Sequence, residues 1–381
     1  MSGIEMVPVI HHPEHQADLS PYNGEAAEKV RAFHRSMTEY APTPLVSLAA
    51  LAKRFGVKSF RVKDESKRFG LNAFKALGGS YAMDCVAAGK TWQLTFITAT
   101  DGNHGRGVAW AASRLGHKAV VLMPRGTAQE RLDNILKLGA DARITDLMYD
   151  DVVRLAARLA RENGWYLIQD TSWEGYETVP QLIMQGYLTM FDEMAEQLGD
   201  EVPTHLFLQA GVGSMAAAGA AYFAMRYGEK RQKVIIVEPN TADCIFRTAK
   251  ADDGKTHFCG DDMHSIMAGL CCGEPCMLAW DILRDTADYA VTCPDYIAAN
   301  GMRMLGNPLP GDERIISGES GASTSGLAAA LLTDARLQSI RDELGLDEKA
   351  VVLCISTEGD TDRENYRKIV WQGAWPEPSA E

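Results

Sequence analysis

The sequence has no uninterrupted apolar run of the roughly 18 residues that a membrane-spanning helix requires. Its first residues, 1–23, lack the basic start and the long apolar stretch of a secretory signal. Internal repeats and low-complexity tracts are also missing. These absences exclude a spanning or fibrous chain, and they predict a cytoplasmic protein without a membrane partner.

An excess of basic residues is missing too. The chain carries 38 Lys and Arg against 51 Asp and Glu, which gives a formal net charge of −13, and its basic residues form no stripe. Because a protein that binds a polyanion needs clustered Lys and Arg, nucleic acid is not an expected partner. With 46% hydrophobic and 23% charged residues, the composition is that of a folded globular protein.

Paired C-x-x-C motifs are absent among the eight cysteines, six of which lie between residues 244 and 293. The spacing of "CCGEPC" does not match a closed zinc site, even with two histidines nearby, so we expect no bound metal. Reduced thiols are the simplest interpretation of these cysteines. A local disulfide between Cys244 and Cys271 or Cys272 stays open.

What the chain does contain is a regular alternation of short β-rich runs and helical segments. At 381 residues it exceeds the usual size of one hydrophobic core, so two domains or one enlarged α/β domain are expected. The alternation predicts an α/β fold with mostly parallel sheets covered by helices on both faces. Ligands of such sheets bind at the carboxyl ends of the strands. The predicted strands are residues 94–100, 118–124, 141–145, 165–170, 204–210 and 233–239, and one long helix is expected over 177–198.

The loop "TATDGNHGRG", residues 98–107, follows the first of these strands. Its glycines would expose backbone N–H groups at the start of a helix, where the helix dipole and the unpaired donors attract a phosphate or carboxylate. Asn103 and His104 add polar groups that a plain turn does not require. For the loop alone, a tight turn built from Asp, Gly and Asn is the simpler alternative.

A second glycine-rich loop, "QAGVGSMAAAG" at residues 209–219, also follows a strand. Gly211 and Gly213 allow the backbone to approach a ligand, and the Ser214 hydroxyl completes a cup suited to a phosphate. A dinucleotide site is the alternative, since an acid ends a later strand. The G-x-G-x-x-G pattern of such sites, however, fails at Ala216.

Two further segments, "SGESGAST" at 317–324 and "CISTEGDTD" at 354–362, carry small hydroxyl residues and an acid, as loops that line a pocket would. Structural turns are the alternative for each. Lys75, in "NAFKALGG", would by itself be an ordinary solvated helix lysine. Together with the two anion-binding loops, it favours a phosphorylated cofactor held at several points, with the small residues around Lys75 lying against that cofactor.

The order of these strings resembles the fold type II pyridoxal phosphate enzymes, the family of tryptophan synthase β and the serine/threonine dehydratases, over residues 40–370. Within it, "NAFKALGGSYA", "TATDGNHGRGVAWAA", "QDTSWEGY" and "STEGDTD" are similar to strings of the diaminopropionate ammonia-lyases. The resemblance implies two lobes, each with a mostly parallel twisted sheet. Residues 1–92 and 200–381 would form a large cofactor-binding domain, and residues 93–199 a small domain that carries the TDGNH substrate loop.

The resemblance also implies roles for individual residues. Lys75 would form a Schiff base with the aldehyde of pyridoxal 5′-phosphate and, once the substrate amine displaces it, take a proton from Cα. Other cofactor contacts would be Asn103 at the ring oxygen, Ser356 or Thr357 at the pyridine nitrogen, Glu319 near the ring, and Gly211, Val212, Gly213, Ser214 and Met215 at the phosphate. Substrate contacts would come from Thr100, Asp101, Gly102 and His104.

Asp101 departs from the dehydratase pattern, which has a small residue before the Gly-Asn pair. An acid beside a substrate carboxylate is unfavourable by about 1 to 4 kcal/mol at close range, so a second ammonium group on the substrate would compensate for it. 2,3-Diaminopropionate carries such a group on Cβ. The resemblance implies that Asp101 acts as a base opposite Lys75, which would let D and L isomers react, and that Asp170 assists the β-amino group or proton transfer. A structural acid at a helix start or in a loop is the alternative for Asp170.

The predicted reaction is an α,β-elimination that converts D- or L-2,3-diaminopropionate to pyruvate and two molecules of ammonia. Two alternatives stay open. One is a β-eliminating dehydratase or lyase that acts on serine, threonine or 3-hydroxyaspartate. The other is a non-catalytic protein that binds pyridoxal phosphate. Relatives of the family imply a homodimer.

Overall fold

The computed structural model describes residues 3–100, 102–260 and 263–378. Its strands are β1 (Glu5–Pro8), β2 (Leu45–Ser47), β3 (Ser59–Asp64), β4 (Thr95–Ala99), β5 (Lys118–Met123), β6 (Asp141–Ile144), β7 (Tyr166–Leu167), β8 (His205–Gln209), β9 (Lys233–Pro239), β10 (Tyr289–Cys293) and β11 (Val351–Ser356). The six predicted strands are β4 to β9, within a few residues of the expected bounds.

The α-helices, in chain order, cover most of the remaining chain. They are α1 (Gly24–Arg35), α2 (Ala49–Phe55), α3 (Ala76–Ala87), α4 (Asn103–Leu115), α5 (Gln129–Leu136), α6 (Tyr149–Asn163), α7 (Thr178–Gly186), α8 (Leu188–Leu198), α9 (Ser214–Tyr227), α10 (Cys244–Ala251), α11 (Met277–Thr286), α12 (Asp295–Gly306), α13 (Glu319–Thr333), α14 (Gln338–Leu344) and α15 (Arg363–Val370). Short 3-10 helices are η1 (Ser20–Tyr22), η2 (Glu65–Gly70), η3 (Gly228–Lys230), η4 (Ala268–Leu270) and η5 (Ala335–Leu337).

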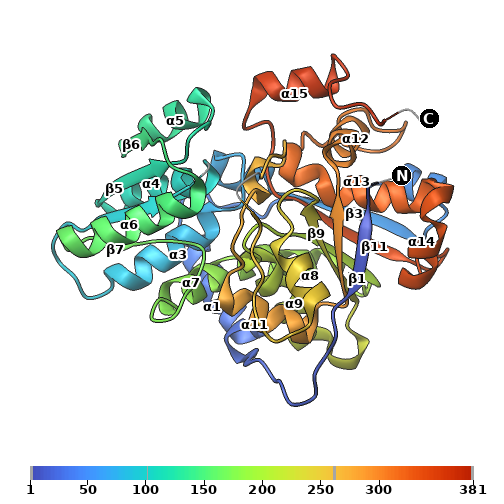
Figure 1. The fold of residues 1–381 in the computed structure, drawn as a ribbon, viewed down its shortest axis with the longest axis horizontal. Helices are drawn as coiled ribbons and strands as arrows, with labels where there is room; N and C mark the ends of the chain where they lie inside the picture. The colour runs from blue at the N-terminus through green and yellow to red at the C-terminus, as the bar shows by residue number, and fades with distance from the viewer. Residues whose placement is uncertain (1–2, 101, 261–262, 379–381) are drawn as a thin grey trace.

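The strands form two sheets, which lie side by side in Figure 1. The larger sheet has the order β1-β10-β9-β8-β11-β3-β2, and the smaller has the order β6-β5-β4-β7. In the larger sheet the outer strands β1 and β2 pair antiparallel with β10 and β3, whereas the inner neighbours are parallel. Every pair in the smaller sheet is parallel. The predicted α/β fold with mostly parallel sheets is confirmed.

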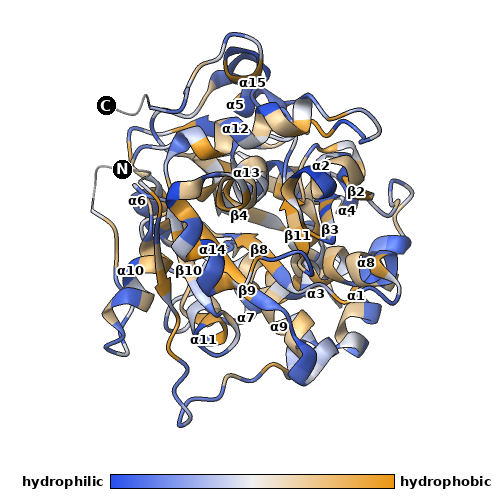
Figure 2. Cartoon of the chain, turned by 90° about the vertical axis from the view of Figure 1, so that its right-hand side faces the viewer, coloured by the Kyte–Doolittle hydropathy of each residue, from blue (hydrophilic) through white to orange (hydrophobic). Residues whose placement is uncertain are grey.

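Helices cover both faces of the larger sheet because successive residues of a strand point to opposite sides. In β8, Leu206 and Leu208 pack into one hydrophobic core, together with residues of α7, α8, α9 and α11, whereas Phe207 packs into a second core with residues of α12 and α13. Figure 2 shows the hydrophobic strands β8, β9 and β11 enclosed by these helices. The inner strands are therefore buried on both faces, as parallel strands usually are.

The smaller sheet uses one continuous stretch of chain, residues 95–167, whereas the larger sheet takes strands from both sides of that stretch. The division into domains 1–92 with 200–381 and 93–199 stays a prediction. The single helix expected over 177–198 is two helices, α7 and α8, because the Tyr187 N–H donates to the Met184 carbonyl, only three residues back.

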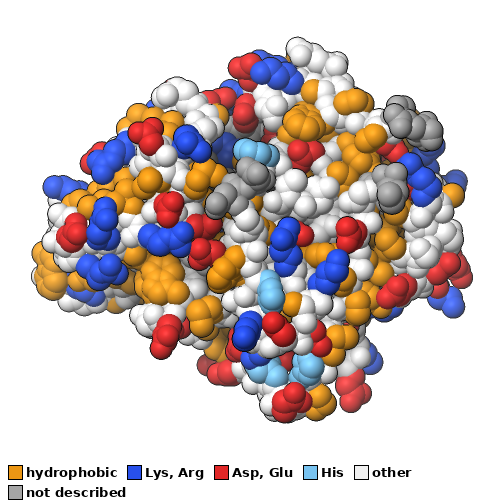
Figure 3. All heavy atoms as spheres, in the orientation of Figure 1, with side chains coloured by type: hydrophobic (Ala, Val, Ile, Leu, Met, Phe, Trp, Pro, Cys, Tyr) orange, Lys and Arg blue, Asp and Glu red, His pale blue; other side chains and the backbone are white. Residues whose placement is uncertain are grey.

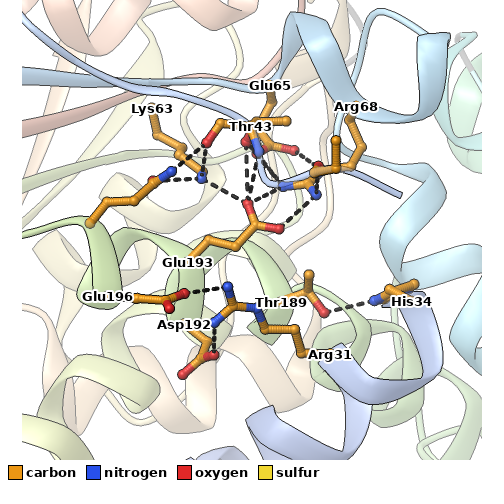
Figure 4. Close-up of polar contacts among 12 residues, drawn as sticks. Arg31, His34, Thr43, Lys63, Glu65, Arg68, Thr189, Asp192, Glu193 and Glu196 are labelled. Atoms are coloured by element: carbon orange, nitrogen blue, oxygen red, sulfur yellow. Dashed lines mark hydrogen bonds and ion pairs between the residues drawn. The ribbon is translucent and has the colours of Figure 1, made fainter. Parts of the chain in front are cut away.

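A network of fully buried charges holds the segment that precedes Lys75 (Figure 4). Arg68, in η2, donates to both oxygens of Glu193 on α8, at 2.8 and 2.7 Å, and to both oxygens of Glu65, at 2.9 and 2.8 Å. Lys63, at the end of β3, adds a 2.8 Å contact to Glu193. All four of these side chains have 0% exposure, so their charges are balanced inside the protein rather than by water.

The structure also describes the surface charges, potential metal ligands and cysteines that the sequence analysis considered. On the face shown in Figure 3, basic side chains are interspersed with acidic and hydrophobic ones. No helix of the described residues has the length and apolar character needed to traverse a bilayer. Among the same residues, no three or more potential metal ligands gather. All eight cysteines are free thiols, so the structure holds no disulfide at Cys244.

Candidate active site

One cavity is lined by residues that follow the carboxyl ends of β4, β8 and β11, and by Lys75 directly before α3. The predicted site residues that line it are Lys75, Thr100, Asn103, His104, Asp170, Gly211, Val212, Gly213, Ser214, Met215 and Thr357. Gly102, Glu319 and Ser356 are not part of this lining. Asp101 lies outside the described residues. Segments far apart in sequence therefore meet where parallel strands of this fold class bind ligands.

Lys75 and Asp170 form an ion pair inside the cavity, between Nζ and Oδ2. Lys75 is fixed by the turn that begins α3, and Asp170 lies shortly after β7, so the pair joins the two sheets. The Asp170 residue is only 3% exposed. Because a buried acid needs a cation or hydrogen-bond donors, the pair keeps both side chains charged.

The surroundings of Asp170 keep it ionised. Burial alone would raise its pKa, but the charges of His104 and Lys75 and the hydrogen bond from Lys75 outweigh burial and lower the pKa to about 2. His104 lies with Nδ1 3.9 Å from the Asp170 carboxylate, and its Nε2 is 2.8 Å from the Ile168 carbonyl. At neutral pH, Asp170 is therefore an anion that can accept a proton or bind a cation.

The glycine loop after β8 forms a cup at the start of α9. Gly213 has φ +96°, which favours glycine, and a Cβ on Gly211 would lie 3.1 Å from Cys272 Sγ. In such an arrangement, the N–H groups of the first turn of α9 can bind an anion. The Ser214 hydroxyl donates to the Asp170 carbonyl at 2.6 Å, so it fixes the cup to the acid-bearing segment.

The TDGNH loop is shaped by Thr100. Its hydroxyl accepts hydrogen bonds from the N–H groups of Gly102, at 2.9 Å, and Gly105, at 3.1 Å. Gly102 has φ +155°, and an added Cβ would lie 3.0 Å from Arg131 Cδ. The loop therefore requires glycine, and the first turn of α4 begins at Asn103, at the edge of the cavity.

Glu358 is a site residue that the sequence interpretation missed. The Asn103 side-chain amide donates to Glu358 Oε2, and the Thr361 hydroxyl donates to the same oxygen at 3.2 Å. Glu358 is 2% exposed and lines the cavity, and its Oε1 is buried without a hydrogen-bond partner among the described groups. The signal was present, because this acid directly follows the predicted Ser356 and Thr357.

Gln209, the last residue of β8, was also missed. Its Nε2 donates to the carbonyls of Ile355, at 2.9 Å, and Ser320, at 3.2 Å, which joins β8, β11 and α13 beneath the cavity. Its Oε1 is buried without a partner in the described part of the chain. A polar residue that ends an apolar strand just before a glycine turn is the sequence signal for such a position.

Two predicted contacts lie behind the cavity. The Ser356 hydroxyl donates to Ser317 Oγ at 2.7 Å, whereas Thr357 reaches the cavity because the chain turns there after β11. Glu319 accepts from Asn365 Nδ2 at 2.5 Å, and burial, followed by the charge of Glu358, raises its pKa to about 7. The segment from Glu319 onward is the first turn of α13, not the loop that the sequence suggested.

The small residues beside Lys75 serve helix packing, which corrects the expectation that they lie against a cofactor. A Cβ on Gly78 would lie 2.6 Å from Tyr187 Cε1 and 2.8 Å from the Ile183 carbonyl. A Cβ on Gly107 would lie 2.8 Å from Ala76 Cα. Close approach of α7 and α4 to α3 therefore requires glycine at these positions.

Comparisons with known proteins define the class of this fold and site. The family model described as "Pyridoxal-phosphate dependent enzyme" matches residues 37–358. The chain therefore belongs to the pyridoxal-phosphate dependent enzymes. The diaminopropionate ammonia-lyase of Escherichia coli (strain K12) is 50% identical to it, covering 94% of this chain and 96% of that protein. The enzyme of the same name from Salmonella typhimurium (strain LT2) is 48% identical, covering 94% and 95%. Within the class, the chain is a member of the diaminopropionate ammonia-lyase family.

Solved structures agree with this membership. The chain matches Escherichia coli diaminopropionate ammonia-lyase in complex with D-serine with a TM-score of 0.92 and 46% identity, covering 98% of both chains. It matches the same enzyme in complex with an aminoacrylate-PLP azomethine reaction intermediate with a TM-score of 0.91 and 48% identity, again covering 98% of both chains. Pyridoxal 5′-phosphate is the cofactor of the family.

The described residues fit that cofactor. Lys75 is the one lysine among the described residues of the cavity lining, and the glycine cup of α9 lines the same cavity. An added Cβ on Gly211 would also lie 3.2 Å from the Gly269 carbonyl, so glycine keeps the cup open. Buried oxygens of Gln209 and Glu358 lack partners among the described groups. An amine, an anion cup and unused polar atoms are what an aldehyde-bearing phosphorylated ring requires.

Proposed function

We propose that this protein is a carbon–nitrogen lyase that uses pyridoxal phosphate to convert D- and L-2,3-diaminopropionate and water to pyruvate and two molecules of ammonia. The partly buried ion pair between Lys75 and Asp170 is the observation that carries the proposal. The pair supports the proposal because an amine, which could hold the cofactor, and an ionised acid, which could bind a cationic substrate, lie together in one cavity. The high identity to diaminopropionate ammonia-lyases supports the same substrate.

Lys75 and Asp170 have different roles in the proposed reaction. The cofactor, when bound, accepts the electron pair left at Cα after proton removal. Lys75 holds the cofactor aldehyde and, once released, takes the Cα proton of the L isomer. While Lys75 is not an ammonium, the buried Asp170 lacks its cation. The β-ammonium of diaminopropionate compensates for that charge, and a hydroxyl group of serine does not.

The remaining assignments concern the ring, the phosphate and the second isomer. Asn103, which Glu358 holds through a hydrogen bond, contacts the ring oxygen. Thr357 rather than Ser356 faces the pyridine nitrogen, because only Thr357 of the two lines the cavity. Asp101 acts as the base for the D isomer. The cup residues bind the phosphate, and they are Gly211, Val212, Gly213, Ser214 and Met215.

A substrate panel tests this function. Holoenzyme is supplied with D- and L-2,3-diaminopropionate, D- and L-serine, L-threonine and 3-hydroxyaspartate, and keto acid and ammonia are both quantified. The expected result is the highest kcat/KM on diaminopropionate, with two ammonia released per pyruvate. A highest kcat/KM on serine with one ammonia per pyruvate would identify a dehydratase instead. Absence of turnover across the panel would identify a non-catalytic binding protein.

A covalent test addresses the cofactor separately. Reduction of holoenzyme with borohydride followed by peptide mass spectrometry should find the cofactor on Lys75. Lys75→Ala protein should retain no reduced cofactor and should lose the L-isomer reaction. Cofactor fixed to another lysine would contradict the assignment of Lys75.

We also propose that the enzyme is a cytoplasmic homodimer, as the family resemblance implies. Light scattering of purified holoenzyme should give twice the mass of the chain. Cell fractionation of the native host should recover the activity with soluble proteins. A monomer mass, or activity in the membrane fraction, would contradict these two assignments.

A further inference from the structure

A second hollow lies apart from the active-site cavity, between α5 and the start of α15. Figures 1 and 2 both place these helices side by side along the upper edge of the molecule. The hollow has a volume of about 470 Å³, and none of its lining residues lines the active-site cavity. Its charged lining consists of Arg106, Glu130 and Lys137 on the side of the smaller sheet, and Asp360 and Arg363 on the other. We call it the α5–α15 cleft.

Arg106 is the unusual residue of this cleft. It is half-buried on α4, and its Nη1 donates to the Leu71 carbonyl at 2.8 Å. Its Nε is buried without a hydrogen-bond partner, and no carboxylate of the described chain lies within ion-pair distance of its guanidinium. A partly desolvated cation without a counter-charge is unfavourable, so this position favours an anion from outside the chain.

The other charges that face Arg106 leave a positive excess. Burial and then the charge of Arg363 lower the pKa of Arg106. Asp360 accepts from Asn72 Nδ2 at 3.2 Å and lies 3.8 Å from Arg363 Nε, so it is already engaged. Glu130 is the other acid of the cleft, against three basic residues.

We propose that the α5–α15 cleft binds a small oxyanion, a carboxylate or a phosphate, between Arg106 and Arg363. Two guanidinium groups are suited to such a ligand because their N–H groups form charge-assisted hydrogen bonds to its oxygens. Lys137 adds a third positive charge at the rim. The ligand supplies the counter-charge that the described residues do not supply to Arg106.

The ligand would act as an effector, because the cleft is connected to both sides of the active site. Arg106 holds the Leu71 carbonyl, four residues before Lys75. The next residue, Asn72, accepts a hydrogen bond from the Gly359 N–H at 3.0 Å, directly after Glu358. An oxyanion at Arg106 therefore stabilises the contact between α4 and the segment that carries Lys75.

Calorimetric titration of the holoenzyme tests the site with two probes, inorganic phosphate and acetate, at ionic strength held constant with NaCl. Holoenzyme is used so that the phosphate cup of the cofactor is filled. We expect saturable binding of at least one probe with one site per chain. Phosphate alone would indicate a phosphorylated effector, and acetate alone or both would indicate a carboxylate.

Exposed cleft residues give variants that should fold normally. Arg363→Ala and Lys137→Ala should each weaken binding about tenfold or more, the loss that follows from one charge-assisted contact. Arg367→Ala, on the same helix but outside the cleft lining, should bind as the unchanged protein does. Equal affinity in Arg363→Ala and Arg367→Ala, or no saturable binding of either probe, would overturn the proposal.

Kinetics separate this site from the substrate path. The bound probe should change kcat for diaminopropionate without competing with it, and this change should disappear in Arg363→Ala. Purely competitive inhibition would place the probe in the active site and would overturn the separate site. Because binding is measured by heat, failure of the proposed lyase activity would leave the binding result intact.

Discussion

At the scale of single residues, the ion pair between Lys75 and Asp170 makes each side chain depend on the other. The charge of Lys75 and its hydrogen bond are among the contacts that lower the pKa of Asp170, so this buried acid needs another cation whenever Lys75 is not an ammonium. The proposed role of Asp170 predicts that the site distinguishes substrates by their charge at Cβ. It also explains why an acid so deeply buried is tolerated in a protein whose net charge is already negative.

Asp170→Asn should preserve the shape of the site and remove its charge. We expect kcat/KM for diaminopropionate to fall by about 10² to 10⁴, the range for loss of a proton-transfer or charge-bearing group. Steady-state kinetics measures kcat/KM, and reduction with borohydride shows that the variant still binds the cofactor. Asp141→Asn, at an exposed strand start, should match the unchanged enzyme. Full activity of Asp170→Asn would remove Asp170 from the reaction.

Glu319 should make stability depend on pH. Its pKa is raised from 4.5 to about 7, so between these values the folded protein holds a proton that the unfolded chain releases. The free energy of unfolding therefore falls as pH rises through this interval, and the cost persists above it. Glu319→Gln removes this titration. Its free energy of unfolding, relative to that of the unchanged protein, should therefore rise by up to about 3 kcal/mol between pH 4 and pH 8. Urea unfolding of the two apoenzymes at pH 4 and pH 8 measures this change. The same difference in free energy of unfolding at both pH values would contradict a raised pKa for Glu319.

At the scale of elements, the position of Lys75 depends on how closely α4 approaches α3. Gly107→Ala would place a methyl group 2.8 Å from Ala76 Cα, a backbone atom that cannot rotate away. We expect the free energy of unfolding to fall by about 1 to 3 kcal/mol, as measured by urea unfolding. Cofactor retention, measured by the absorbance of bound cofactor, should also be weaker. Gly24→Ala, with no atom within 4 Å of the added Cβ, is the matched control and should change neither quantity.

The buried charges between β3, η2 and α8 give a second prediction at this scale. Arg68→Met would leave Glu65 and Glu193 buried without their shared cation, and should destabilise the protein by about 3 to 5 kcal/mol. Arg154→Met removes an arginine whose side chain is 61% exposed, and should change stability by less than about 0.5 kcal/mol. Urea unfolding compares the two variants. A similar small change for both would show that the buried network is not required.

The sequence predicted elements well where local chemistry decides them. β4, β5, β8 and β9 are apolar runs that end at glycine or proline turns, so their type and place were visible. The start of α13 was not, because its Gly, Ser and Ala residues are buried all round and show no amphipathic period. Glu358 and Gln209 were missed for a related reason. The local sequence marks both positions, but their partners lie more than 100 residues away, so the contacts that make them part of the site could not be predicted.

At the scale of the whole molecule, the two sheets differ in how far apart their strands lie along the chain. The smaller sheet joins neighbours within residues 95–167, whereas β11 pairs with β3 and β8. Because long loops must close before distant strands pair, the smaller sheet should form first on refolding. Pulsed hydrogen exchange should find amides of β4 and β5 protected before those of β3 and β11. Protection at the same rate in both sheets would contradict this order.

The central position of β11 has a consequence for synthesis on the ribosome. β11 is the last strand of the described residues, yet it lies between β8 and β3 in the larger sheet. Until it has left the exit tunnel, both neighbours keep an unpaired edge, which is the kind of surface that associates with other nascent chains. A chain that stops before residue 351 therefore lacks the strand that pairs with both β8 and β3, and a chaperone would have to cover the unpaired edges of these two strands.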